Sequence, residues 1–268
     1  NNHLGRGYQG APIAITVEGA NILTRNMMIY GQGAIRCHPY VLKEMYAAAD
    51  EDREQGLRDF DEALFGHIGF AMSNFFRSLW FSISGARLAD APFSDETAQY
   101  YRAMKRYSTN MALLSDVAMA VLGGELKRRE RLSARLGDIL SYLYLGSAVL
   151  KRFDDQGRVS DDLPLMHWAM QDTLHKLEVA MSDLLDNFPS KALGFTLRMV
   201  IMPFGKQFTP PSDDLDHKIA TMLQTPCDAR ERLGEGQYTR REAGNPAGEL
   251  EQILEDILQS EPLYERVC

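Results

Sequence analysis

The carboxylate of Glu18 lies among apolar and small residues near the start of the chain. Its neighbours include Val17, Gly19 and Ala20, at a point where a loop is expected to pass into a helix. Poor solvation disfavours the charged form of a carboxylate and raises its pKa toward neutrality. Glu18 is therefore a candidate general base toward a weak carbon acid. The local sequence by itself favours a structural alternative, in which Glu18 complements a helix dipole and Thr16 caps that helix.

The segments around Glu18 indicate how it would be positioned. Residues 1–15 contain glycines and a proline and predict an extended loop. Apolar residues then recur at helical spacing over residues 18–35, and the pair His38-Pro39 ends this pattern. A second helix is expected over residues 39–49, because proline is well suited to the first turn. The charged residues 50–55 place a domain boundary near residue 50.

Metal and disulfide chemistry are not predicted. The cysteines Cys37, Cys227 and Cys268 are far apart and odd in number, so they do not define a disulfide framework. Cys37 and His38 are adjacent potential ligands, but two ligands without a third do not make a metal site. We therefore predict no bound metal and a reducing, cytoplasmic environment.

Beyond residue 56 the chain is expected to be helical throughout, because apolar residues recur at helical spacing without convincing strand alternation. The predicted fold class is all-α, a multi-helix bundle preceded by the extended N-terminal loop. Ser94 is expected to cap the second of these helices. The periodic segments are 60–85, 94–122, 125–153, 162–187, 193–205, 212–223 and 250–258.

Charge and hydropathy exclude some classes of function. The net charge of −8 and the absence of a basic stripe argue against a nucleic-acid partner. The basic residues 127–131 can hold a phosphate of coenzyme A or face anionic lipid, although an exposed helix face with internal ion pairs is the commoner arrangement. Residues 193–205 form the most apolar run, whose length of about 13 residues favours a buried or interfacial helix over a bilayer crossing.

Three segments near the start have a distinctive sequence, namely RGYQGAP at residues 6–12, ITVEGANILTR at 15–25 and GQGAIRCHP at 31–39. Together they resemble the closing segment of the flavin-dependent acyl-CoA dehydrogenases, and in particular the long bacterial form that acts in fatty-acid β-oxidation. Residues 113–124 and 127–140 are similar to the helical C-terminal extension of that form. The resemblance covers essentially the whole chain.

The resemblance implies roles for particular residues. Glu18 matches the glutamate that removes the α-proton of the acyl thioester, and Gly19 matches the residue that lies against that thioester. Asn21 matches a position beside the flavin and is a candidate FAD contact. The threonine that commonly follows Glu-Gly is Ala20 here, so only backbone contact is implied at that position. Residues 1–50 correspond to the end of the catalytic core and residues 51–268 to the extension.

The same resemblance implies partners and a context. The substrate would be a fatty acyl-CoA, the cofactor FAD, and the further partners an electron-acceptor protein and other copies of the chain. The family's flavin-binding strands would precede Asn1, so we expect a piece of a longer protein that does not turn over alone. Two alternatives stay open: a non-catalytic helical oligomerisation module, and a module that docks peripherally on the inner membrane.

Overall fold

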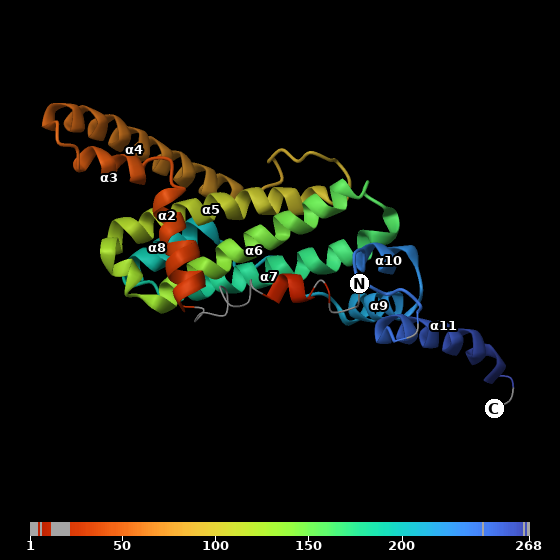
Figure 1. Ribbon diagram of the computed structural model, residues 1–268. Coiled ribbons are helices and arrows are strands. Elements are labelled where there is room, and N and C mark those ends of the chain that lie inside the picture. The colour runs from red at the N-terminus through yellow and green to blue at the C-terminus, as the bar shows by residue number, and fades with distance from the viewer. Residues whose placement is uncertain (1–4, 6, 12–21, 243, 265, 267–268) are drawn as a thin grey trace. The chain divides into compact units, whose positions relative to one another are not determined.

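The computed structural model describes residues 5, 7–11, 22–242, 244–264 and 266. Every regular element within these residues is a helix, so the predicted all-α, multi-helix fold is confirmed (Figure 1). None of the helices in these ranges combines the length and the apolar character that crossing a membrane requires. Within the stretch expected to be an extended loop, Gly5 and residues 7–11 are helical.

The chain divides into two compact units. The larger comprises the described residues of 20–159 and 165–211, and the smaller those of 1–19, 160–164 and 212–268. The smaller unit contains η3 (Ser160–Asp162), α9 (Asp213–Gln224), α10 (Asp228–Leu233) and α11 (Pro246–Tyr264). The larger contains η1 (Ile22–Gln32), α2 (Gly33–Arg36), α3 (Val41–Ala48), α4 (Arg53–Ile83), α5 (Ala98–Leu122), η2 (Gly123–Lys127), α6 (Glu130–Asp155), all but the first turn of α7 (Leu163–Asp186), and α8 (Lys191–Ile201).

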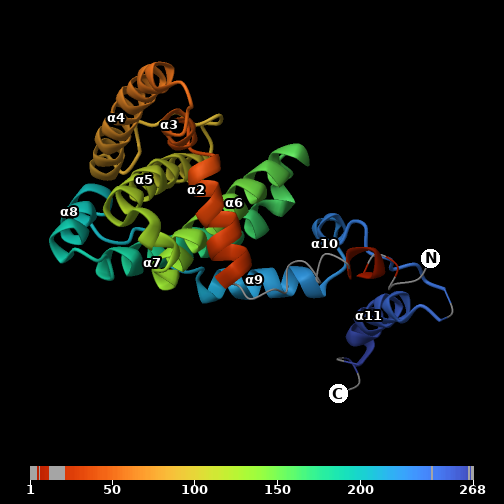
Figure 2. The same cartoon turned by 60° about the vertical axis from the view of Figure 1, so that its left-hand side comes forward.

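The core of the larger unit lies between α5, α6 and α7 (Figures 1 and 2). On α7, apolar residues recur every three or four positions and so share one buried face, which is why the periodic sequence predicted this helix. Gly146 on α6 permits close packing, since a Cβ there would lie 2.9 Å from Met104 Sδ and 3.5 Å from Met170 Cε. The fully buried apolar residues of the three helices include Tyr107, Leu114, Leu136, Ile139, Met170, Leu174, Leu177 and Met181.

The segment after the predicted catalytic loop packs on this core. The expected helix is present from Ile22, but as the π-helix η1, which packs on α6 and continues through α2 to Arg36. The break at His38-Pro39 and the second helix are confirmed, the latter as α3. Helix α3 packs against α4, and a Cβ on Gly56 would lie 2.6 Å from the carbonyl oxygen of Ala47.

The predicted cap at Ser94 is wrong. Helix α5 begins at Ala98, where the side chain of Asp95 accepts a hydrogen bond from the backbone N–H of Thr97 at 2.9 Å. Arg158, in the turn that follows α6, donates to Asp95 at 2.6 Å and to Thr97 at 2.9 Å. This distant arginine fixes the turn, which is why the local sequence pointed to the wrong residue.

Helix α4 carries an exposed apolar stripe that faces away from the core. The periodicity of residues 60–85 predicted an apolar face on this helix, although that prediction did not include Phe65. The five side chains recur at spacings of three and four residues and are 49–71% exposed. By contrast, α4 contacts α3, α5 and α8 through its other faces. The exposed stripe consists of Phe65, Ile68, Met72, Phe76 and Trp80.

Candidate functional site

The predicted site residues Glu18, Gly19 and Asn21 lie outside the described residues, so their roles stay predictions. The nearest described element is η1, and two side-chain contacts fix it to α6. Arg25 forms an ion pair of 2.7 Å with Asp138 on α6, and the Asn26 side chain donates to the carbonyl oxygen of Glu130 at 3.5 Å. The chain that follows the predicted base is therefore anchored to the helical core.

Burial shapes the ionisation of two groups at this anchor. Burial raises the pKa of the Tyr30 hydroxyl to about 12, and this hydroxyl donates to Ser115 Oγ at 3.3 Å. Burial also raises the pKa of Asp138, against the opposing effect of the positive charge of Arg25. Tyr30 stays neutral near pH 7 and acts here as a hydrogen-bond donor rather than as a base.

Four titratable side chains meet between α3, α4 and α5, namely His38, Glu44, His67 and Asp116. His38 Nε2 lies 2.9 Å from Asp116 Oδ1, and His67 Nε2 lies 3.8 Å from the same oxygen. His67 Nδ1 lies 2.8 Å from Glu44 Oε1. Cys37, the sequence neighbour of His38, is exposed and is not among these contacts. The sequence pointed to His38 as a weak ligand candidate but did not indicate His67 or Asp116.

The ligand atoms of His38, His67 and Asp116 lie within 4.8 Å of one another, a spacing that a metal ion can bridge. The hydrogen bonds of His38 argue against this use. Its Nδ1 accepts from the backbone N–H groups of Tyr40 and Val41 at 3.2 and 3.1 Å, so the ring proton lies on Nε2. Nε2 therefore donates to Asp116 and has no free lone pair for a metal.

The electrostatics of this cluster are set mainly by burial. Burial raises the pKa of Asp116 and lowers that of His38, and in each case the partner's charge acts in the opposite direction. Asp116 Oδ2 is buried and has no hydrogen-bond partner among the described residues. A neutral His38 that donates to Asp116 is consistent with both pKa shifts. Through this contact the cluster joins the segment before α3 to α5.

A second buried group was missed by the sequence analysis. The carboxylate of Glu178 on α7 is fully buried and accepts hydrogen bonds from the Tyr107 hydroxyl and from the backbone N–H groups of Gln207 and Phe208. One signal was available, because Glu178 lies on the apolar face of α7, between Leu177 and Met181. A carboxylate at such a position must find partners from other elements.

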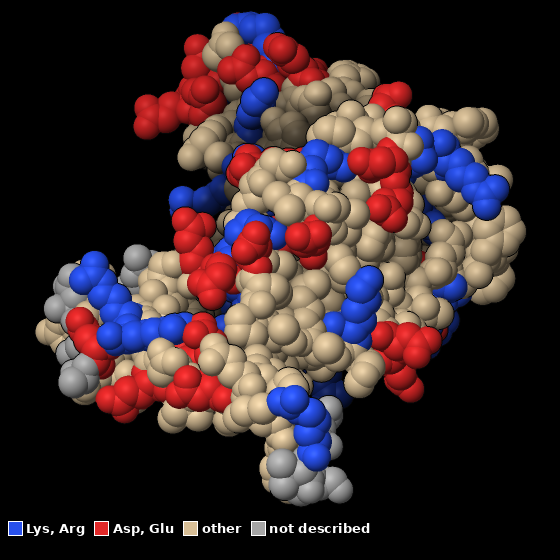
Figure 3. Space-filling view, turned by 90° about the vertical axis from the view of Figure 1, so that its right-hand side faces the viewer, with Lys and Arg blue, Asp and Glu red and all other residues tan. Residues whose placement is uncertain are grey.

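The basic segment 127–131 runs from the end of η2 into the start of α6, and its residues are exposed. Arg128 pairs with Glu125 at 2.9 Å, while Arg129 and Arg131 have no side-chain partner among the described residues. On the face shown in Figure 3, acidic and basic side chains are interspersed. The two alternatives for this segment, an anion contact and an exposed helix face, both remain predictions.

Comparison with known proteins identifies the family. No solved structure matches the chain. Residues 35–268 match the family model described as acyl-CoA dehydrogenase, C-terminal, bacterial type. The match begins within α2 and includes the helices α3 to α11 and the histidine cluster. The chain therefore belongs to the family of bacterial-type C-terminal domains of acyl-CoA dehydrogenases.

Proposed function

We propose that this chain is part of an FAD-dependent acyl-CoA dehydrogenase that oxidises a fatty acyl-CoA to the trans-2-enoyl-CoA. The observation that carries the proposal is the family match over residues 35–268. It begins shortly after the segment ITVEGANILTR, which resembles the family's catalytic-base segment. Two stretches of one chain thus support the same reaction.

The reaction removes a proton from the α carbon and a hydride from the β carbon of the thioester, which leaves a double bond between them. Glu18 would take the proton on its carboxylate, and Gly19 would contact the thioester through its backbone. No side chain accepts a hydride, so FAD would supply that chemistry when bound. Asn21 is the residue of this chain that we assign to FAD, and the other flavin contacts would come from segments that precede Asn1.

Replacement of Glu18 by glutamine tests the proposal in the longer protein in which a dehydrogenase core precedes this chain. A general base contributes about 10²–10⁴-fold to a rate, so Glu18→Gln should reduce acyl-CoA oxidation by at least that order while bound flavin absorbance is retained. Glu62→Gln on α4 is the matched control, because Glu62 is exposed. Near-normal turnover in Glu18→Gln would refute the assignment.

A second proposed role is oligomerisation through the apolar stripe of α4. Contiguous exposed apolar surface of this kind usually marks an interaction site. The side chains of Phe65 and Phe76 are 71% and 60% exposed. We assign a second copy of this chain as the occupant, and peripheral membrane docking is the alternative outcome.

Sedimentation equilibrium separates these outcomes. The chain should be oligomeric, and Phe65→Gln combined with Phe76→Gln should shift it toward the monomer. Leu88→Gln is the control, because Leu88 is an exposed apolar residue that follows α4 and lies outside the stripe. A chain that stays monomeric and floats with liposomes would favour membrane docking instead.

A further inference from the structure

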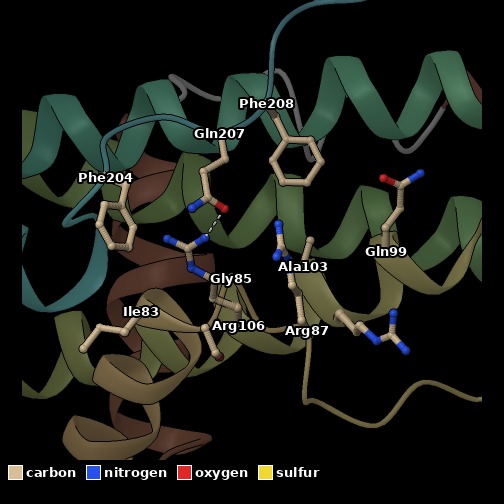
Figure 4. Close-up of a pocket in the computed structure, with 11 residues that line it drawn as sticks. Ile83, Gly85, Arg87, Gln99, Ala103, Arg106, Phe204, Gln207 and Phe208 are labelled. Atoms are coloured by element: carbon tan, nitrogen blue, oxygen red, sulfur yellow. Dashed lines mark hydrogen bonds between the residues drawn. The ribbon is translucent and has the colours of Figure 1, made fainter.

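A basic pocket of about 570 Å³ lies in the larger unit, away from the predicted catalytic loop in sequence. Its floor comes from the end of α4, the turn that follows it, and α5, and its opposite wall comes from the segment after α8. In Figure 4, Arg87 and Arg106 extend toward this wall, and Phe204 and Phe208 lie on either side of Gln207. The volume is that of a site for one small molecule.

The pocket has an excess of positive charge. Arg87, Arg102 and Arg106 line it, and no aspartate or glutamate does. Glu178 is the nearest buried carboxylate along this wall, since it binds the backbone of Gln207, and it can offset one of the three charges. Burying a cation is costly unless an anion compensates it. Of the three arginines only Arg106 is buried, and Arg87 and Arg102 add positive charge at the more open part of the pocket, so the lining favours an anionic ligand.

The hydrogen bonds of the arginines leave donors for such a ligand. Arg106 is only 2% exposed and binds neutral acceptors, Gln207 Oε1 at 2.6 Å and the carbonyl oxygen of Ile201 at 3.0 Å. Its Nε is buried without a partner among the described residues. Arg102 donates from Nε to the carbonyl oxygen of Ala89 at 3.1 Å, and no acidic side chain pairs with its guanidinium in the described part of the chain.

The wall opposite the arginines is aromatic. Phe204 is 68% exposed and lines the pocket together with the arginines. Phe208 is half-buried, and Glu178 holds it in place by accepting its backbone N–H at 2.8 Å. A flat ring can pack against these phenylalanines while an attached anion contacts the arginines.

We propose that this pocket binds an organic phosphate of the nucleotide class, with phosphate on Arg87 and Arg102 and the base against Phe204 and Phe208. Phosphate matches the charge excess and the fork of guanidinium donors better than a single carboxylate does. The buried Arg106 sets the charge at the base of the pocket. This site makes no use of Glu18, so its failure leaves the proposed dehydrogenase function untouched.

Calorimetric titration of the chain with ADP, pyrophosphate and adenosine tests the proposal. ADP should bind more tightly than either of the other two, because it alone engages both the arginines and the aromatic wall. Phe204→Ala should weaken ADP but not pyrophosphate. No binding of ADP, or equal binding of ADP and pyrophosphate, would overturn the assignment to a nucleotide.

Variants locate the binding. Arg87→Gln combined with Arg102→Gln should weaken ADP about tenfold or more, which corresponds to the loss of one strong contact. Arg53→Gln combined with Arg58→Gln changes the net charge equally at exposed positions of α4 outside the pocket and should leave affinity unchanged. Arg87 and Arg102 are exposed and half-buried, so the variants should fold, and a thermal melt checks this. Equal loss in both pairs would refute the site.

Discussion

Glu178 is the residue whose replacement tests the packing of the larger unit most sharply. Its carboxylate joins α7, α5 and the segment after α8, because it binds Tyr107, Gln207 and Phe208. In Glu178→Gln, the amide oxygen can still accept from the two backbone N–H groups, but the amide nitrogen then faces the Tyr107 hydroxyl. In Glu178→Ala all three donors lose their acceptor.

The magnitudes follow from these contacts. Hydrogen bonds to a charged group contribute about 1.5–3 kcal/mol each, and neutral ones about 0.5–1.5 kcal/mol. Glu178→Gln also removes a buried charge, which offsets part of the lost hydrogen-bond energy. The free energy of unfolding should therefore fall by about 2 kcal/mol. A buried unsatisfied donor costs about 1–3 kcal/mol, so Glu178→Ala, which leaves three donors and a cavity, should cost about 4 kcal/mol or more.

Urea denaturation measures the free energies, and hydrogen exchange locates the effect. Protection of the Gln207 and Phe208 amides should fall in both variants, and more in Glu178→Ala, because both N–H groups bind Glu178. The exposed Glu62→Gln serves again as the control for the loss of charge. Both Glu178 variants within about 0.5 kcal/mol of the wild type would refute this reasoning, since that is the range of an ordinary surface substitution.

Two further predictions concern pH and packing. Burial lowers the pKa of His38 below its ordinary 6.5, so the unfolded chain binds the proton more readily, and this contribution to stability is present above pH 6.5 and lost as pH falls. Wild type should thus lose stability relative to His38→Gln between about pH 7.5 and 5.5. Asp116, whose pKa is raised, acts in the opposite direction in both proteins. Parallel curves of unfolding free energy against pH, measured by denaturant titration, would contradict the prediction. On α4, Gly69→Ala should stabilise by up to about 1 kcal/mol, because open space surrounds that position. Gly56→Ala should destabilise by about 1–2 kcal/mol, because its Cβ would meet Ala47, and equal shifts of the melting temperature would disprove the packing argument.

Most of the helices could be predicted from the periodicity of apolar residues, because an amphipathic helix repeats these residues along one face whatever its neighbours are. The stripe on α7 and the break at His38-Pro39 were predictable for this reason. The start of α5 was not, since Arg158 stabilises a turn at Asp95 that is distant in sequence. Local caps compete with such tertiary contacts, and here the tertiary contact prevails.

The candidate sites also combine features that the sequence could predict with features that it could not. The chemistry assigned to Glu18 came from resemblance, because its immediate neighbours fit a helix start equally well. The basic pocket joins Arg87 and Arg106 to Phe204, which follows them by 117 and 98 positions, and no local pattern links them. Glu178 could have been flagged as a charged residue on an apolar stripe, but its three donors could not be named without the fold.

Removal of the α-proton is the step that the central claim assigns to Glu18. The most direct measurement is deuterium exchange at the α carbon of a bound acyl-CoA in heavy water, made with a protein in which a flavin-loaded dehydrogenase core precedes this chain. The wild type and Glu62→Gln should exchange this hydrogen, and Glu18→Gln should not, although it retains flavin. Exchange at the wild-type rate in Glu18→Gln would contradict the account, because another group would then have to be the base.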